Sequence, residues 1–264
     1  MPHLWRPPRH AVLAPFVDSF EYVEDTPGTA QERMIPGGGV SLVVTLRDDG
    51  FVRTDLDGPR WVDGACLTGP QRRAQVISTA PQRGMVAVNF SPGGAAPFLP
   101  LPLHAVADDY PSLGEVWGRP GAVVRERLAG ADPPQLLDLA EQVLLEQVVG
   151  PLVRDRALDL ALRALGRGAP VGAVVERFGT TAKPFIRRFR ATTGLTPKTY
   201  ARLRRLQRLL ASVPSDGPVD WARLAGEHGF YDQSHLVHDF SAITGITPSA
   251  YRPRSADARN HLPV

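Results

Sequence analysis

The chain has 264 residues, of which 43% are hydrophobic, a formal net charge of +3 and one cysteine. This length fits one large or two moderate domains, and the hydrophobic fraction is enough for a buried core. No run of about 18 apolar residues and no secretion signal is present, so we expect a soluble, cytoplasmic protein. A single cysteine excludes an internal disulfide and a cysteine-based metal site, which fits a reducing compartment.

The net charge conceals an asymmetry between the two halves. Residues 1–150 carry 12 Arg or Lys against 18 Asp or Glu, a net charge of −6, whereas residues 151–254 carry 17 against 8, a net charge of +9. A basic half beside an acidic half is typical of a nucleic-acid-binding module joined to a part that need not touch DNA. A solvated basic surface would give the same count, so charge alone leaves both interpretations open.

The N-terminal half reads as a series of short β-strands. We expect strands at residues 16–23, 40–46, 51–54, 61–67, 74–79 and 85–90, separated by Gly, Pro and Asp turns. The Asp49-Gly50 pair predicts a hairpin that joins the second of these strands to the third. Many short strands at such spacing favour a sandwich or barrel, so the predicted fold class is α+β with an N-terminal β-barrel.

Residues 1–150 contain little that could support catalysis. Their histidines, His3, His10 and His104, lack the close spacing that a shared metal ion needs. Cys66 lies on an expected strand without a neighbouring base and reads as a small buried residue. No Gly-x-Ser-x-Gly elbow or phosphate-binding loop is present. We therefore expect no enzyme, no cofactor and no metal, but a domain that binds.

A binding pocket in this half would be lined by large apolar side chains and a few polar ones. The aromatic residues on the expected strands are therefore the candidate effector-binding residues: Phe20, Tyr22, Trp61 and Phe90. Ordinary core packing is the alternative for each of them. The chemical identity of the effector does not follow from the sequence.

The pattern becomes helical after Ala122. A helix is expected from Pro133 to about Val149, and its apolar stripe could either cover the β domain or pair with its copy in a homodimer. Gly150-Pro151 marks the expected boundary, and a helix at 152–165 begins the second domain. The predicted divisions are therefore 1–150, 151–254 and a disordered tail at 255–264.

The second domain contains an internal repeat. A set of seven residues recurs 51 positions later in the same order: Phe189, Ala191, Thr193, Gly194, Thr196, Pro197 and Tyr200 become Phe240, Ala242, Thr244, Gly245, Thr247, Pro248 and Tyr251. The same residues at the same spacing indicate that one supersecondary unit is used twice.

Each copy reads as helix, tight turn, helix. In the second copy Gly229 can end a short helix in the left-handed conformation, and Asp232 is the expected N-cap of a helix at 233–243. In the first copy a supporting helix ends at Gly179, and Thr181 caps a helix at 182–192. A further helix, Tyr200 to Leu210, joins two helix-turn-helix units.

Two such units joined by a helix resemble the DNA-binding domain of the AraC/XylS family of transcription regulators, over roughly Asp155 to Arg252. The second unit carries the family signature in Ala225, Gly229, Phe230, Asp232, Gln233, Ser234, His235, Phe240, Gly245, Thr247, Pro248, Tyr251 and Arg252. It departs at Leu236, where an aromatic residue is common, and at His238 and Asp239, where basic residues are usual on the expected DNA side.

The resemblance implies a sequence-specific DNA-binding transcription regulator. Members often carry a cupin-like N-terminal barrel that binds a small effector, so we expect that sensor here, with double-stranded DNA as partner and RNA polymerase or a second copy as further partners. The run Phe90-Ser91-Pro92-Gly93-Gly94 resembles a segment common in one uncharacterised group of such sensor domains.

A recognition helix enters the major groove and presents its early exposed residues to base edges. The expected DNA-facing residues of the two units are Ala182, Lys183, Ile186, Arg187, Arg188 and Arg190, then Gln233, Ser234, Val237 and His238. Arg187 is the first choice for a guanine contact and Gln233 could read adenine, whereas His235 is expected to support its turn. On the joining helix, phosphate contacts are expected from Arg204, Arg205 and Arg208.

Two alternatives remain open at this stage. An enzyme fused to a DNA-binding domain, such as an alkyl-transferring repair regulator, needs an activated cysteine, and Cys66 lacks that setting. A ligand-free regulator would instead use its N-terminal half for dimerisation or protein interaction. The sequence does not specify the effector, the operator, or activation against repression.

Overall fold

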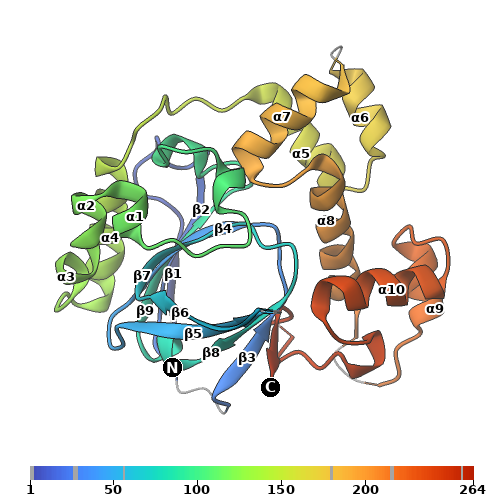
Figure 1. The fold of residues 1–264 in the computed structure, drawn as a ribbon, viewed down its shortest axis with the longest axis horizontal. Coiled ribbons are helices and arrows are strands. Elements are labelled where there is room, and N and C mark those ends of the chain that lie inside the picture. The colour runs from blue at the N-terminus through green and yellow to red at the C-terminus, as the bar shows by residue number, and fades with distance from the viewer. Residues whose placement is uncertain (1–2, 26–28, 56, 179–180, 215–216, 257) are drawn as a thin grey trace.

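The computed structural model describes residues 3–25, 29–55, 57–178, 181–214, 217–256 and 258–264. Figure 1 shows a β-rich N-terminal half with helices on one side of its strands, beside a helical C-terminal half. The predicted α+β class with two domains is confirmed. Among these residues no helix is both long and apolar enough to cross a membrane.

The strands form two antiparallel five-stranded sheets rather than one closed barrel. The first sheet has the order β1 (His3–Arg6), β2 (Val17–Val23), β9 (Met85–Phe90), β4 (Val40–Thr45) and β7 (Ala65–Thr68). The second has the order β10 (His261–Pro263), β3 (Gln31–Met34), β8 (Gln75–Ser78), β5 (Gly50–Asp55) and β6 (Gly58–Asp63). The predicted β-rich domain is therefore a sandwich of two open sheets.

The hairpin predicted at Asp49-Gly50 is wrong. β4 pairs with β7 and β9, whereas β5 pairs with β6 and β8, so the turn carries the chain from one sheet to the other. The predicted strand 61–67 is likewise divided at Gly64, because β6 pairs with β5 in the second sheet and β7 pairs with β4 in the first. Only glycine fits at this crossing, since a Cβ atom there would lie 2.3 Å from Oγ1 of Thr45. A turn signal locates a reversal of the chain but does not say which strands it joins.

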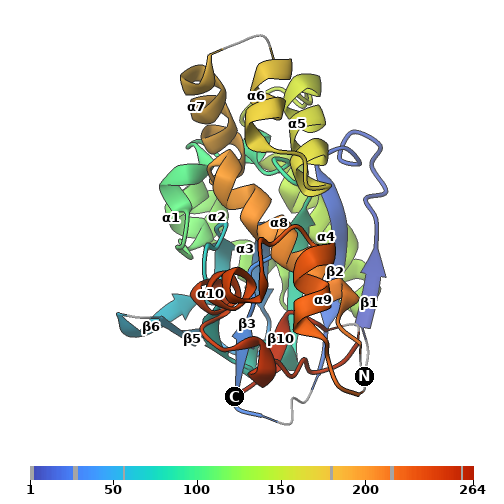
Figure 2. The same cartoon turned by 90° about the vertical axis from the view of Figure 1, so that its right-hand side faces the viewer.

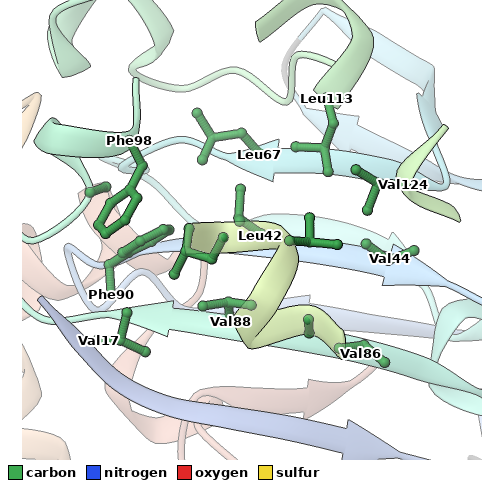
Figure 3. Close-up of a cluster of buried hydrophobic side chains, with 14 of the residues drawn as sticks. Val17, Leu42, Val44, Leu67, Val86, Val88, Phe90, Phe98, Leu113 and Val124 are labelled. Atoms are coloured by element: carbon green, nitrogen blue, oxygen red, sulfur yellow. The ribbon is translucent and has the colours of Figure 1, made fainter. Parts of the chain in front are cut away.

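Helices cover the outer face of the first sheet: α1 (Leu113–Trp117), α2 (Arg119–Ala122), α3 (Val124–Leu128) and α4 (Pro133–Glu146), with the short 3-10 turns η2 (Ala96–Phe98) and η3 (Leu103–Val106). A third 3-10 turn, η1 (Ala80–Arg83), lies between β8 and β9 on the other side of that sheet. Figure 3 shows the core between them, where Leu42, Val88 and Phe90 meet Phe98 and Leu113. The apolar stripe of α4 is buried in this core. Of the two roles left open for this helix, the structure shows the one in which it covers the β domain, and its apolar stripe is already buried within the chain.

The C-terminal half contains α5 (Arg156–Gly166), α6 (Val171–Arg177), α7 (Ala182–Thr193), α8 (Pro197–Ser212), α9 (Trp221–Glu227), α10 (Gln233–Thr244) and the 3-10 turn η4 (Pro248–Ala250). They share one core, with Phe189, Leu203 and Phe240 fully buried. The helices predicted for both units are present at their expected positions. The predicted end of the supporting helix at Gly179 lies outside the described residues.

The described residues 258–264 do not form the disordered tail that was expected for 255–264. β10 pairs with β3 at the edge of the second sheet, and the buried Leu262 joins the core that contains Ile35. The prediction was wrong because a three-residue strand has no usable periodicity and its partner strand lies far away in the sequence. The two halves meet elsewhere too, where the Ala74 backbone N–H donates to the Ile243 carbonyl at 2.6 Å.

Candidate nucleic-acid interface and effector cavity

α7 presents a basic face because its aromatic side chains point inward. Phe185 and Phe189 are buried in a row of rings that runs from Phe178 to Tyr200, with neighbouring centroids 5.2, 5.8 and 5.6 Å apart. The side chains that the sequence assigned to DNA are all exposed: Ala182, Lys183, Ile186, Arg187, Arg188 and Arg190. Arg188 also forms an ion pair with Asp155 at the start of α5.

α10 presents a polar face instead. Asp232 Oδ1 accepts the His235 backbone N–H at 2.7 Å, which confirms the predicted N-cap. His235 Nδ1 accepts the Tyr231 N–H at 3.2 Å, so this ring supports the turn as expected. The predicted DNA-facing residues surround a shallow depression along the helix, with Gln233, Ser234 and His238 exposed and Val237 half-buried.

Both recognition helices lie on one side of the C-terminal half. Figure 2 shows α7 and α10 on the same side, with α8 between them and the supporting helices α6 and α9 on the other side. Their axes are not parallel, since α10 lies across Figure 1 and is seen end-on in Figure 2, whereas α7 stands upright there. Neither helix is buried inside the protein.

Asp239, expected on the DNA side, faces α8 instead and is only 8% exposed. Its carboxylate accepts Arg202 Nε at 2.9 Å and Arg205 Nη2 at 2.6 Å. Arg205 also donates to the Gly229 carbonyl at 3.1 Å and lies over the Phe230 ring. The expected phosphate contact of Arg205 is therefore corrected, because this guanidinium is committed to joining α8 with the turn of the second unit.

The other two arginines predicted on the joining helix have different surroundings. Arg208 donates to the Gly166 carbonyl at the end of α5. Burial, together with the charges of Arg204 and Arg205, lowers the pKa of Arg208. Its expected phosphate contact is corrected to a cap on α5. Arg204 is half-buried beside a depression that Arg163 and Arg167 also line, so its phosphate contact stays a prediction.

Sequence reasoning missed Tyr231, whose side chain is 92% exposed at the start of α10. Its position directly before the N-cap Asp232 places a large ring beside the predicted base-reading end of the helix. The signal available in the sequence was an aromatic residue inside a polar turn, directly after Phe230, which the structure shows to be buried.

A cavity of about 820 Å³ lies between the two sheets. Strand register places Ser19, Asn89, Ser41 and Thr68 in one polar row across the first sheet. Asn89 Nδ2 donates to Ser19 Oγ at 3.0 Å and to Glu21 Oε1 at 2.7 Å, and Ser41 Oγ donates to Asn89 Oδ1 at 2.7 Å. The remaining wall is largely apolar and includes Val43, Phe51, Ile77, Ala87 and Tyr110.

The four aromatic residues predicted to bind the effector do not line this cavity. Phe20, Tyr22 and Phe90 lie on the opposite face of the first sheet, in the core under the helices, and Trp61 is 65% exposed on β6. The structure does not bring these four residues to the cavity, because alternation along a strand defines two faces without saying which one the helices cover.

Cys66 has no features of a reactive thiol. It is fully buried, and burial together with the nearby Asp63 raises its pKa to about 12, so the thiol stays protonated. Within the described part of the chain, no group of three His, Cys, Asp or Glu side chains is placed to hold a metal ion.

Two family models match separate parts of the chain. Residues 174–254 match the model described as a helix-turn-helix domain, which spans both units, and residues 6–112 match a domain of unknown function, DUF6597. The comparison with curated proteins finds no match.

Three solved structures of ToxT from Vibrio cholerae are similar over most of their length. The O395 form bound to (E)-4-(8-methylnaphthalen-1-yl)but-3-enoic acid shares 10% identity at a TM-score of 0.47 and covers 88% of this chain and 97% of its own. An apo form carrying a single substitution shares 12% at 0.45 (88% and 96%), and the form bound to an unsaturated fatty acid shares 10% at 0.42 (94% and 94%). This likeness is too loose to carry function across.

Two helix-turn-helix units with exposed recognition helices define a DNA-binding protein. The domain match bears out the resemblance predicted for this part of the chain: residues 174–254 form an AraC-type helix-turn-helix domain, and the protein is a DNA-binding transcription regulator.

Proposed function

We propose that this regulator binds DNA with α7 in one major groove and α10 in the next groove on the same face, ~34 Å away. The observation that carries the proposal is the exposure of both recognition helices on one side of the domain, joined by the continuous helix α8. In this proposal the two domains divide at Gly150-Pro151, and RNA polymerase or a second copy is a further partner.

The two helices would contribute different contacts. Arg187, on the exposed face of α7, reads a guanine with its planar fork. Lys183 lies one turn earlier, where it reaches a base or a phosphate, and Gln233 reads an adenine at the start of α10. Tyr231 adds a contact to the DNA backbone or to a base next to the one that Gln233 reads.

The cavity between the sheets holds the effector in this proposal. Three carboxylates line it, Glu21, Glu24 and Asp25, whereas Arg254 at its edge already binds Asp25 and Glu32. Glu24 is paired with Arg47 and Asp25 with Arg254, so Glu21 is the lining carboxylate without an arginine partner among the described residues. An anionic group would meet the charge of Glu21 with no free arginine in the described lining to balance it. We infer an effector with an apolar body and a neutral or cationic hydrogen-bonding end.

The DNA-binding part is tested by selecting duplexes from a random library with the full-length protein. We expect enrichment of a site with two short blocks separated by about one helical turn. Enrichment of a single block, or no enrichment, contradicts two-groove binding. Arg60→Ala, an exposed arginine on β6 far from both helices, is the matched control and should select the same site.

The effector part is tested by thermal shift with a matched series that keeps one apolar body and varies its end group as amine, alcohol or carboxylate. Ligands that bind the native state raise the melting temperature. We expect the amine or alcohol to give the larger shift and Asn89→Leu to reduce it. A larger shift with the carboxylate would contradict the inferred chemistry.

A further inference from the structure

The chain does not end at the second helix-turn-helix unit but returns to the N-terminal half. The returning part, Arg254 together with residues 258–264, is called the C-terminal strap below. Its strand β10 pairs with β3, the Ile35 N–H donates to the Asn260 carbonyl at 2.8 Å, and the Val264 N–H donates to the Gln31 carbonyl at 3.2 Å. Figure 2 shows β10 beside β3, below the second unit.

The strap forms one wall of the cavity, through Arg254, Ala258, Asn260 and His261. Arg254 forms an ion pair with Asp25 and donates to Glu32 at 3.0 Å and to Gln82 at 2.8 Å. Glu32 is only 1% exposed. Burial raises its pKa, but hydrogen bonds from His261, Gln82 and Arg254 outweigh that effect and lower it to about 2. The strap therefore supplies the partners that keep a buried carboxylate charged at the cavity edge.

The same strap holds the end of α8. Arg259 Nη1 donates to the carbonyls of Leu210 at 2.8 Å and Val213 at 2.6 Å, which lie where the helix ends. Gln207, one turn earlier, donates to the Asn260 side chain and to the Pro36 carbonyl, both at 3.0 Å. The Tyr251 hydroxyl donates to the Arg259 carbonyl at 2.8 Å. Cavity, joining helix and second unit are thus tied to one short segment.

Resting on the proposed function, we propose that the C-terminal strap is part of the effector site and restrains the second DNA-binding unit when docked. The recognition helices are not parallel in this arrangement, so two-groove binding requires the units to turn relative to each other. That turn moves the end of α8, which the docked strap fixes to β3. An effector that displaces the strap from the cavity edge frees the turn.

The experiment locks the strap reversibly. Gln31 and Val264 are exposed neighbours at the end of the β3–β10 ladder, so Q31C/V264C places two thiols at a cross-strand spacing that a disulfide can bridge. Cys66 is fully buried and does not compete. The reduced form of the same protein is the control for the oxidised form.

We expect the oxidised form to bind the selected duplex about tenfold more weakly than the reduced form, a typical allosteric coupling. Arg254→Ala, which releases the strap from Asp25 and Glu32, should bind more tightly than wild type, whereas Arg60→Ala should not change. Equal affinity of the oxidised and reduced forms, or tighter binding by the oxidised form, overturns the proposal.

A readout without DNA separates this inference from the proposed function. Hydrogen exchange of the backbone amides in the last turn of α8 should slow on oxidation and quicken in Arg254→Ala. The neutral dye Nile red, used as an apolar probe, should bind Arg254→Ala better than the oxidised form. If no form binds any duplex, the proposed DNA-binding function is rejected, whereas hydrogen exchange and dye binding still test whether the strap restrains α8 and closes the cavity. Unchanged exchange and unchanged dye binding overturn it.

Discussion

The two helix-turn-helix units share one scaffold. Each recognition helix ends at a left-handed glycine, Gly194 with φ 77° and Gly245 with φ 71°. Before each glycine a buried threonine donates back to a phenylalanine carbonyl at 2.8 Å, Thr193 to Phe189 and Thr244 to Phe240. The repeated residues of the sequence are therefore the ones that build this shared frame.

The units differ in what the frame presents. α7 exposes Lys183 and three arginines, whereas α10 contains no Arg or Lys and turns its one acid, Asp239, inward to α8. Charge on phosphates sets affinity and salt dependence, and polar side chains on base edges set sequence choice. A duplicated fold can thus carry unequal charge on its two copies, and we expect the first unit to supply most of the electrostatic attraction to DNA.

The shared frame predicts equal and large costs in stability for removing the matching buried ring of either unit. Phe189→Ala and Phe240→Ala each remove a fully buried ring, so each should lower the free energy of unfolding by about 3–5 kcal/mol. Denaturant titration of the full-length protein measures this. Ile186→Ala, on the exposed face of α7, should change it by less than about 0.5 kcal/mol. A difference of several kcal/mol between the two phenylalanine variants would break the equivalence.

The ion pairs of Asp239 involve only the second recognition helix and α8, so their loss should destabilise the second unit more than the first. Asp239→Asn leaves Arg202 and Arg205 without their carboxylate in a mostly buried site, and should cost about 2–3 kcal/mol of unfolding free energy. Hydrogen exchange should locate the added opening in α9 and α10. Opening that is equal in α6 and α7 would contradict a role confined to the second unit.

Much of this frame could be predicted from the sequence. Residues such as Gly194, Gly245 and Asp232 act locally, through a left-handed turn or a cap, and local chemistry is visible in a sequence. Partner choice is not local, so the predicted hairpin at Asp49-Gly50 failed when β4 and β5 went to different sheets. Arg205 and Arg208 were expected to contact phosphates because no residue near them in the sequence indicates that Arg205 binds Asp239 or that Arg208 binds the end of α5.

The cavity proposed to hold the effector shows the same limit of sequence-based prediction more sharply. The polar row through Ser41 and Asn89 exists only once β2, β9, β4 and β7 are in register. One wall of this cavity comes from the C-terminal strap, whose pairing with β3 joins segments from opposite ends of the sequence. No periodicity within one strand could show either feature, and aromatic side chains drew the prediction to the wrong face.

The charge difference predicts unequal losses of DNA affinity. Arg187→Ala should cost about 1–3 kcal/mol on the preferred site and relax the preference at one base pair. Binding curves on the selected duplex and on a set with single base changes measure this. Arg190→Ala, an exposed arginine of the same helix, should weaken all duplexes alike. Equal loss on every duplex in the Arg187 variant would contradict base reading.

Salt dependence gives a smaller but cleaner contrast between the units. Lys183→Gln should reduce the slope of log affinity against log salt by about 1, because one phosphate neutralisation is lost. Gln233→Ala should weaken binding without changing the slope. Titrations at several salt concentrations with one duplex separate the two. A slope change in the Gln233 variant would show that the second unit also contributes counterion release.

Histidine distribution gives the smallest contrast, because the first unit (residues 171–200) has no histidine and the second has three. Burial, with the nearby charge of Arg208, lowers the pKa of His228 at the end of α9 below its ordinary 6.5. The unfolded chain therefore binds the proton more readily, so the stability that neutral His228 contributes is present above pH 6.5 and is lost as pH falls below it. Hydrogen exchange at about pH 7.5 and about pH 5.5 should show added opening in α9 but not in α6, and His228→Gln should remove the difference. An equal pH response in α6 would place its origin outside the second unit.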